Sequence, residues 1–443
     1  MFSVFTLLVI AAALSLCPFW RRERHVLPLY LWAVYCGLGP ATVLGVSPLR
    51  FRWVLGCLFG ALGLWWLWRS PRRTVDSMVA LPAMLIAWAL SSVVYSELPN
   101  YSLLRAVALI PMYLGVFLGV RSLLHEDGGI ERVARCLIAL IGVQVALAIG
   151  AYLFSADASF GGRFQGVYRA TGTAHQLAYA LPFVLLMVSR SLGWRRAATI
   201  SVTALMIYLL LLTRSRTGIL GGVAITPVAY FVYIRRIKSA RLCWALAGTS
   251  LLGAALWILL ANEQTLEFLR ITSGEELIAT RAGRWDLILD ALLDNPWIGH
   301  GYGTVRYFAV GGAMTWTLEA GSASQVNTHN EYLSLWYDLG LVPMGALALF
   351  VATIGWRGAT TLRAPNSPWN ALLVACTLSW FVDALETITH DGLLTIGNPV
   401  STWFWIKSLL IYYATAKWAL QHDLAARGDR APTVLSRGWH APA

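Results

Sequence analysis

The stretch Val133–Phe154 reads VARCLIALIGVQVALAIGAYLF, and its one charged residue, Arg135, lies near its start. An α-helix needs roughly 20 mainly apolar residues to cross the hydrocarbon core of a bilayer. This stretch meets that requirement, and it lacks the alternation of apolar and polar residues that marks the strands of a membrane barrel. It therefore predicts a helix that spans a membrane.

Similar stretches recur along almost the whole chain of 443 residues, of which 58% are hydrophobic and 13% are charged. The mean hydropathy of +0.62 lies far outside the usual range of soluble domains. The sequence predicts an all-α polytopic membrane protein with about 13 candidate spans. They are Phe2–Trp20, Leu27–Leu44, Trp53–Trp68, Met78–Tyr95, Leu103–Leu123, Val133–Phe154, Thr171–Val188, Ala197–Thr213, Gly218–Ile234, Cys243–Ala261, Leu333–Trp356, Trp369–Thr389 and Thr402–Trp418.

Basic residues gather in alternate connections, which predicts that these connections face the cytoplasm. They are Arg21–Arg24, Arg69–Arg73, Arg121–Arg135, Arg190–Arg196, Arg235–Lys238 and Arg357–Arg363. The remaining ones, here called the outward connections, are then expected on the opposite side. They are Glu97–Tyr101, Ser155–Arg169, Arg214–Thr217, Asn262–Asn330 and His390–Pro399.

The first stretch, Phe2–Trp20, lacks a basic leader and a small-x-small cleavage site, so we expect it to be retained and not to act as a cleaved signal peptide. If all 13 stretches cross the membrane, the N-terminus lies outside and the tail after Trp418 lies inside. If Phe2–Trp20 only lies along the membrane or dips into it, both ends are cytoplasmic.

The net charge of +12 and the pI of 9.6 fit positive cytoplasmic loops in contact with anionic membrane lipids, so no nucleic-acid partner is expected. All six cysteines lie within or at the end of apolar stretches, and no CxxC pair occurs. The sequence therefore predicts neither a disulfide scaffold nor a cysteine metal site.

The connection Asn262–Asn330 is the one large polar segment, and connections of this length are usually functional or disordered. We expect an ordered loop, because Glu275–Leu293 has apolar residues at helical spacing and Asn295-Pro296 would end the helix. The apolar residues are Ile278, Ala282, Trp285, Leu289 and Leu292. The predicted segments are thus N-terminal helices (1–261), an outward helical loop (262–330), C-terminal helices (331–418) and a cytoplasmic tail (419–443).

Arginines occupy the outward connections, although basic residues usually favour the cytoplasmic side. They include Arg163, Arg169, Arg214, Arg216, Arg281 and Arg284. A guanidinium group binds phosphate oxygens in a bidentate manner and stays charged at any working pH, so converging arginines would suit a diphosphate. The alternative for each residue is an interfacial arginine whose charged end reaches lipid headgroups.

Histidine is the natural general base near neutral pH, and His175, His300, His329 and His390 lie near the outward side. His329 is the strongest candidate, because it stands where the long loop re-enters the membrane. Inside one span, Asp383 and Glu386 lie one helical turn apart, either as a functional pair or as partners for buried polar groups.

Three motifs in this order resemble the bacterial O-antigen ligases, within the wider O-antigen ligase and polymerase superfamily. They are Thr213-Arg214-Ser215-Arg216-Thr217-Gly218, then Arg281-x-x-x-Trp285 followed by Asn295-Pro296-Trp297-Ile298-Gly299-His300-Gly301-Tyr302-Gly303, and His329-Asn330-Glu331-Tyr332-Leu333 leading to Asp338-Leu339-Gly340. The glycines around His300 suggest a sharply turned or flexible loop, because no strand precedes them as in a nucleotide-binding loop.

The resemblance implies a GT-C-like bundle of about 12 transmembrane helices with both ends in the cytoplasm, in the bacterial inner membrane. It implies transfer of a polysaccharide from undecaprenyl diphosphate, the donor, to a sugar hydroxyl of lipid A–core, the acceptor. The transfer would occur at the periplasmic face, with inversion at the anomeric carbon and without a metal or nucleotide cofactor. No Asp-x-Asp-like pair appears in the outward connections to hold a divalent ion.

The family's catalytic positions correspond here to Arg216, Arg281 and His329. The resemblance implies that the two arginines, assisted by Arg214 and Arg284, stabilise the diphosphate leaving group. His329 would take the proton of the acceptor hydroxyl or orient it. The remaining predicted substrate-site residues are Asn330 and Glu331, beside the imidazole, and Arg163 and His175, near the donor sugar or acceptor.

Three other functions remain open. An O-antigen polymerase would share the donor and much of the fold, but the single dominant loop favours a ligase. A protein-glycosylating member of the superfamily would be expected to have a larger periplasmic C-terminal part. A transporter or lipid flippase would use charges within spans such as Asp383, but the sequence shows no repeated halves.

Overall fold

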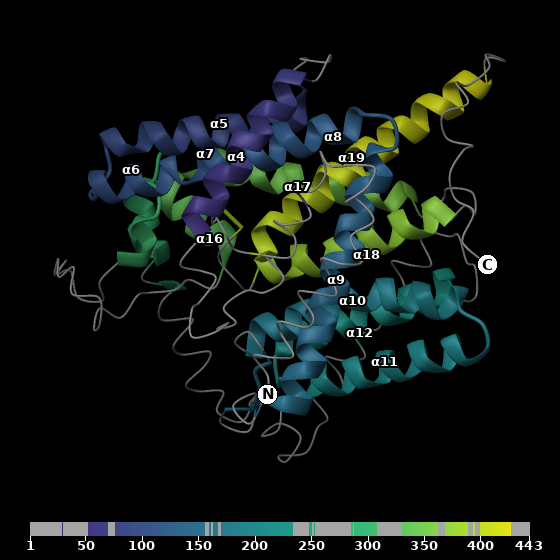
Figure 1. Cartoon of the computed structure of the whole chain (residues 1–443). Helices are drawn as coiled ribbons and strands as arrows, with labels where there is room; N and C mark the ends of the chain where they lie inside the picture. The colour runs from purple at the N-terminus through teal and green to yellow at the C-terminus, as the bar shows by residue number, and fades with distance from the viewer. Residues whose placement is uncertain are drawn as a thin grey trace.

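The computed structural model describes residues 29, 52–69, 76–155, 159–160, 163–166, 170–233, 248–249, 252, 285–286, 288–307, 330–361, 368–388, 393–394 and 399–426. These residues form a largely α-helical protein with one short β-hairpin (Figure 1). The elements are α4 (Arg52–Arg69), α5 (Ser77–Ser91), η3 (Ser92–Val94), α6 (Pro99–Val107), α7 (Leu109–Met112), η4 (Tyr113–Val120), α8 (Arg121–His125), α9 (Gly129–Phe154), β1 (Ser159–Phe160), β2 (Arg163–Phe164), α10 (Ala170–Arg190), α11 (Gly193–Leu212), α12 (Arg216–Tyr233), η6 (Thr304–Tyr307), α16 (Glu331–Leu339), α17 (Leu341–Thr361), α18 (Pro368–Thr387) and α19 (Pro399–Ala426).

Among the described residues, six helical segments are long and apolar enough to cross a membrane. They are Ser77–Val94, Pro99–His125, Gly129–Phe154, Ala170–Arg190, Gly193–Leu212 and Leu341–Thr361. The prediction of a multi-pass, all-α membrane protein is confirmed at this level. The predicted spans Phe2–Trp20, Leu27–Leu44 and Cys243–Ala261 lie almost wholly outside the described residues.

One predicted boundary is wrong. The sequence suggested a single span over Leu333–Trp356, but the structure divides it into α16 and α17. Gly340 between them has a φ of +87°, which is favourable only for glycine, and its amide nitrogen donates to the Trp336 carbonyl. The membrane-spanning helix therefore begins at Leu341, and α16 is a separate short helix that leads into it.

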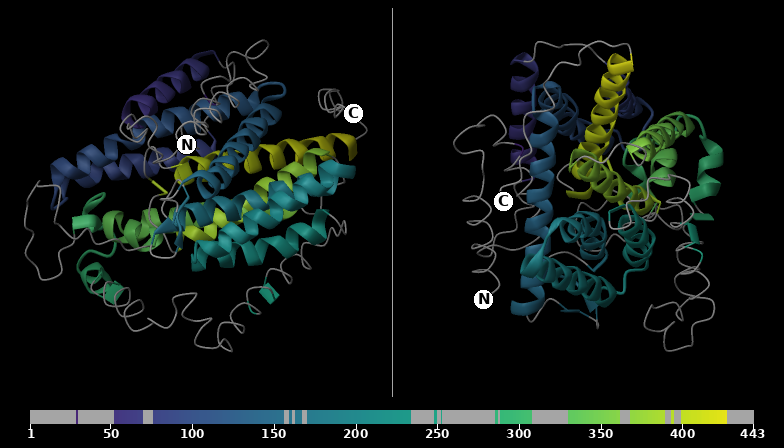
Figure 2. Two further views of the ribbon diagram at one scale, coloured as in Figure 1. Left: turned by 60° about the horizontal axis from the view of Figure 1, so that its bottom comes forward. Right: turned by 90° about the vertical axis from the view of Figure 1, so that its right-hand side faces the viewer.

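The helix α9 runs across the bundle and connects two groups of helices, α4–α8 and α10–α12 (Figures 1 and 2). Glycines allow close approach within the second group. A Cβ atom on Gly218 of α12 would lie 2.5 Å from the Cβ atom of Ala174 on α10. Small residues at such contacts let helix backbones pack closely in membranes, where apolar burial adds little driving force between helices.

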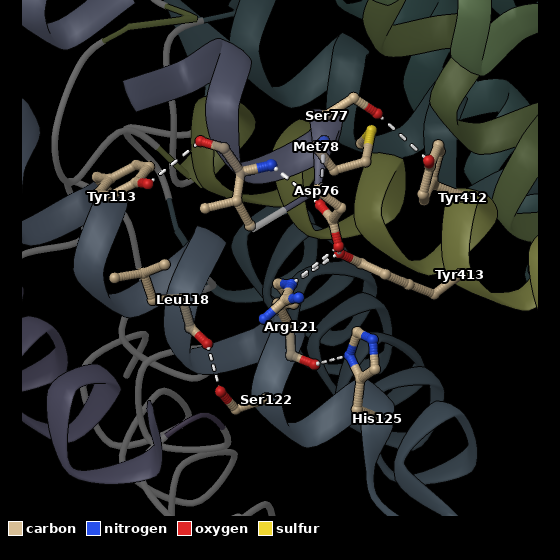
Figure 3. A network of polar contacts seen from close by, with 11 residues as sticks. Asp76, Ser77, Met78, Tyr113, Leu118, Arg121, Ser122, His125, Tyr412 and Tyr413 are labelled. Atoms are coloured by element: carbon tan, nitrogen blue, oxygen red, sulfur yellow. Dashed lines mark hydrogen bonds and ion pairs between the residues drawn. The ribbon is translucent and has the colours of Figure 1, made fainter. Parts of the chain in front are cut away.

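A polar network joins the helix ends near Arg121 (Figure 3). The Arg121 Nε atom lies 3.0 Å from both Asp76 Oδ2 and the Tyr413 hydroxyl, and that hydroxyl donates to Asp76 at 2.5 Å. Asp76 also caps α5 by accepting from the amide nitrogens of Met78 and Val79 at 3.1 and 3.2 Å. The network fixes the starts of α5 and α8 to the middle of α19.

Arg357 of α17 also belongs to this end of the bundle, because its guanidinium carbon lies 4.0 Å from the centre of the Tyr412 ring. Arg121 and Arg357 come from two connections that the charge pattern predicted on the same side. The structure therefore brings these two basic connections together, as the predicted alternation requires.

Candidate functional site

The hairpin β1–β2 contacts the turn between α11 and α12. Its strands are antiparallel, with Phe160 opposite Arg163. The Arg163 Nε atom donates to the Thr213 carbonyl oxygen at 2.9 Å. Arg163 of the predicted outward connection Ser155–Arg169 thus binds Thr213, the residue directly before the predicted connection Arg214–Thr217.

The turn itself places two arginines in locally unfavourable positions. Arg214 has a φ of +50°, a left-handed conformation that is uncommon outside glycine, and Arg216 is the first residue of α12. A cation at a helix N-terminus opposes the helix dipole, whereas an anion bound there is stabilised by the dipole. A strained backbone conformation and an unfavourably placed charge are both typical of functional sites. The two arginines would therefore suit an anionic ligand.

A buried ion cluster lies a short distance along α10. The two ring nitrogens of His175 face two carboxylates of α18: Nε2 lies 3.0 Å from Asp383 Oδ1, and Nδ1 contacts Glu386 Oε2. Lys407 of α19 contacts Asp383 Oδ2 and donates to the Ser379 hydroxyl at 3.0 Å. We call His175, Asp383, Glu386 and Lys407 the interhelical quartet; they are at most 6% exposed.

The quartet supports one of the two alternatives raised for Asp383 and Glu386, namely partners for buried polar groups. Burial of an isolated charge is very costly, so two acids and two bases in contact compensate one another. His175 is held in this cluster, and its predicted role in substrate binding remains a prediction. Within the described part of the chain, no group of three His, Cys, Asp or Glu residues could hold a metal ion.

The glycine-rich segment at 299–303 is a sharp turn that packs on α16. The φ angles of Gly299, Gly301 and Gly303 are +72°, +109° and +86°, which confirms the turned loop expected from the sequence. Asp338 of α16 holds the turn, since its carboxylate accepts from the amide nitrogens of Gly303 at 2.8 Å and Val305 at 2.9 Å. Asp338 is 5% exposed.

His300 in this turn contacts the connection between η3 and α6. Its Nδ1 atom lies 3.2 Å from Glu97 Oε1, and its Nε2 atom lies 3.0 Å from the Ala291 carbonyl oxygen. The imidazole stacks on Tyr337 with 4.5 Å between ring centres. Burial raises the pKa of Tyr337, and the nearby Glu97 and Asp338 charges raise it further. Tyr337 therefore stays neutral as a stacking partner.

The helix before this turn buries part of its predicted apolar face, since Leu292 is buried and Trp285 packs in the same cluster. Residues 288–294 are helical, and the chain leaves the helix at Asn295-Pro296 as expected. However, Leu289 is 44% exposed, whereas Ile288 is buried and packs with Leu292. The sequence pattern had placed Leu289 on an apolar face that packs either on the membrane or on the other loops, and that placement stays a prediction.

The beginning of α16 connects the loop to α18. Asn330 is the N-cap and accepts from the Leu333 amide nitrogen at 3.0 Å. Glu331, which is 5% exposed, accepts from the Leu393 amide nitrogen at 3.1 Å. The Tyr332 hydroxyl hydrogen-bonds to Thr387, the residue after Glu386. Burial raises the pKa of Tyr332, while this hydrogen bond lowers it.

These contacts gather most of the described candidate residues at one end of the bundle. Tyr332 and Thr387 connect α16 to the quartet, and Ala174, beside His175, packs on Gly218 near Arg216. In Figure 1, α6 and α16 lie toward the left, and the α10–α11 turn lies toward the right. His329, Arg281, Arg284 and Arg169 lie outside the described residues.

The prediction from sequence missed two residues. Lys407 was given no role, although it is one of three lysines and stands inside an apolar stretch, where a charge is costly. Arg105 was included in the predicted span Leu103–Leu123, yet α6 places it beside the glycine-rich turn, 6.0 Å from the centre of the Tyr302 ring.

The described helices and their buried polar contacts define a multi-pass α-helical membrane protein with a candidate site at one end of the bundle. Residues 201–351 match the family described as O-antigen ligase. This range contains α12, the glycine-rich turn and α16. The family match therefore covers most of the candidate site.

A second comparison agrees with the family match. The chain is 27% identical over 221 residues to an O-antigen ligase of Pseudomonas aeruginosa. That alignment covers 49% of this chain and 47% of the relative, so the chain matches about half of that protein's length. Together the two matches support an O-antigen ligase-type protein and confirm the resemblance predicted from the motifs.

Proposed function

We propose that this protein is an O-antigen ligase of the bacterial inner membrane, with its active site facing the periplasm. The proposed donor is a polysaccharide on undecaprenyl diphosphate, and the acceptor is a sugar hydroxyl of lipid A–core. The observation that carries the proposal is the family match over residues 201–351, because this range contains all three sequence motifs. The finer architecture, a GT-C-like bundle of about 12 helices with both ends in the cytoplasm, is part of the proposal.

The proposed chemistry is a single displacement at the anomeric carbon. The acceptor oxygen forms the new glycosidic bond, and the bond between the anomeric carbon and the diphosphate oxygen breaks with inversion. His329 accepts the proton of the hydroxyl, and undecaprenyl diphosphate leaves with the bonding electrons. Arg216 and Arg281, with Arg214 and Arg284 nearby, stabilise the charge that develops on the leaving group.

The described geometry supports part of this assignment. The unfavourable local positions of Arg214 and Arg216 are understandable if both bind an anion. Asn330 caps α16 directly after His329, so the backbone next to the proposed base is held by a helix. Arg163 fixes the neighbouring turn through its bond to Thr213.

The first test replaces the proposed catalytic residues in cells that make O-antigen. His329→Ala and Arg281→Ala should insert in the membrane normally but give lipopolysaccharide without attached O-antigen. The matched control, Arg195→Ala, changes an exposed arginine at the start of α11 and should leave attachment normal. Normal amounts of capped lipopolysaccharide in either of the first two variants would refute the assignment of that residue.

The second test separates ligase from polymerase with the purified full chain. It receives a lipid-linked polysaccharide and lipid A–core, and products are separated by mass. A ligase forms the joined product, whereas a polymerase lengthens the lipid-linked chain and leaves the acceptor unmodified. The second result would replace the ligase proposal by its rival.

A further inference from the structure

Arg105 lies on α6 and packs against the glycine-rich turn. Its guanidinium carbon lies 6.0 Å from the centre of the Tyr302 ring. Its Nε atom is buried and has no hydrogen-bond partner among the described residues. A buried donor without a partner costs free energy comparable to a lost hydrogen bond, so the arrangement needs a physical reason.

The glycine-rich turn lies very close to the Arg105 side chain. Gly303, with a φ of +86°, faces Arg105 so closely that an added Cβ atom would lie 3.2 Å from Arg105 Cγ and 3.3 Å from its Nε. The same Cβ would lie 3.2 Å from the Tyr101 ring. Arg105 therefore lies between two tyrosines and a backbone segment that has no side chain in the way.

Nearby carboxylates do not accept a hydrogen bond from this Nε atom. Asp338 and Glu331 act on Arg105 electrostatically. However, Asp338 accepts from the backbone amides of Gly303 and Val305, and Glu331 accepts from the amide of Leu393. The Nε donor of Arg105 therefore has no carboxylate acceptor among the described residues.

Arg105 is also connected through Tyr302 to the region of the proposed base. Tyr302, the ring beside Arg105, donates to the Leu394 carbonyl at 2.8 Å and so contacts the same connection as Glu331. Glu331 is two residues from the proposed base, His329. A permanently charged, planar group at this place fits a phosphate, which accepts two parallel hydrogen bonds from a guanidinium.

We propose that Arg105 binds a phosphate oxyanion of one of the two lipid-linked substrates, between the side chains of Tyr101 and Tyr302. This inference rests on the proposed ligase function and adds an arginine from α6 to the arginines of the matched motifs. The phosphate has two sources: the diphosphate of the donor, and phosphate groups on the core sugars of the acceptor.

The kinetic test uses the full chain with Arg105→Gln and with Arg105→Lys, which keeps the charge but not the planar fork. The KM for one substrate should rise about 10- to 100-fold in Arg105→Gln, with less change in kcat and a partial recovery in Arg105→Lys. A rise for the donor identifies the diphosphate. A rise for the acceptor that vanishes when its core phosphates are removed enzymatically identifies those groups.

The control is Arg195→Gln on α11, since Arg195 also lies 6.0 Å from an aromatic ring, that of Trp194. It should leave both KM values unchanged. A lowered unfolding temperature in Arg105→Gln with unchanged KM values would mean that Arg105 only balances the charges of Asp338 and Glu331. That result would overturn the proposal.

A binding measurement without turnover separates this proposal from the ligase assignment. Inorganic pyrophosphate is titrated into the detergent-solubilised full chain by calorimetry, and Arg105→Gln should weaken its binding about 10- to 100-fold. If this dependence is found but no ligation occurs, Arg105 is an anion-binding residue and the proposed function fails. If ligation is normal in the variant and pyrophosphate binds with unchanged affinity, the Arg105 proposal fails alone.

Discussion

Replacing Lys407 by methionine tests the energetic role of the interhelical quartet. The change removes an ammonium group that is 0% exposed, contacts Asp383 and donates to Ser379 at 3.0 Å. Methionine has a similar length and no charge, so little cavity forms. The main effect is that Asp383, which is 1% exposed, loses its contact with the ammonium group.

Removal of one member of a buried ion pair typically costs about 3–5 kcal/mol, because the other charge stays buried without compensation. Here His175 still lies 3.0 Å from Asp383 Oδ1, so we expect a loss near the lower end of this range, about 3 kcal/mol. Combining Lys407→Met with Asp383→Asn removes both charges. The double variant should be more stable than the sum of the two single changes predicts.

The assay is denaturant unfolding of the purified protein in detergent, followed by tryptophan fluorescence. Lys417→Met is the matched control, because Lys417 is on the same helix, is partly exposed and should cost less than about 0.5 kcal/mol. The reasoning is refuted if Lys407→Met is as stable as the control, or if its effect adds to that of Asp383→Asn without any coupling.

Two further predictions concern the turn and the helix contact near the site. Asp338→Asn leaves one of the amides of Gly303 and Val305 without an acceptor, costs about 1–3 kcal/mol and should speed hydrogen exchange of residues 299–305. Exchange no faster than in the exposed control Asp290→Asn would contradict this. Gly218→Ala brings a methyl group within 2.5 Å of Ala174 and should destabilise the bundle by about 1–3 kcal/mol. The control is Gly142→Ala on α9, where the added methyl group meets nothing within 4 Å and should not destabilise the bundle. Equal thermal unfolding temperatures of the two variants would argue against close packing of α10 and α12.

The sequence by itself determined the features that depend on neighbouring residues in the chain. Continuous apolar runs predicted the spanning helices, and the alternation of basic connections predicted that Arg121 and Arg357 lie at the same end. The Asn295-Pro296 pair ended its helix, and the glycines after it formed a turn, because backbone sterics act within a few residues. The motifs and their order also predicted the resemblance to O-antigen ligases that the comparisons support.

Only the tertiary structure decided which polar groups meet. His175 and Asp383 are 208 positions apart, and no periodicity in the chain pairs them or assigns Lys407 to the same cluster. The apolar residues on both sides of Gly340 concealed the break between α16 and α17. Ile288 and Leu289 both fit an apolar helix face, so the sequence could not decide which of them is buried. Arg105 was missed because its importance depends on Tyr302 and Gly303, which folding brings from nearly 200 residues away. Hydropathy and local sterics fix the helices, whereas charge pairing depends on distances that exist only after the helices pack.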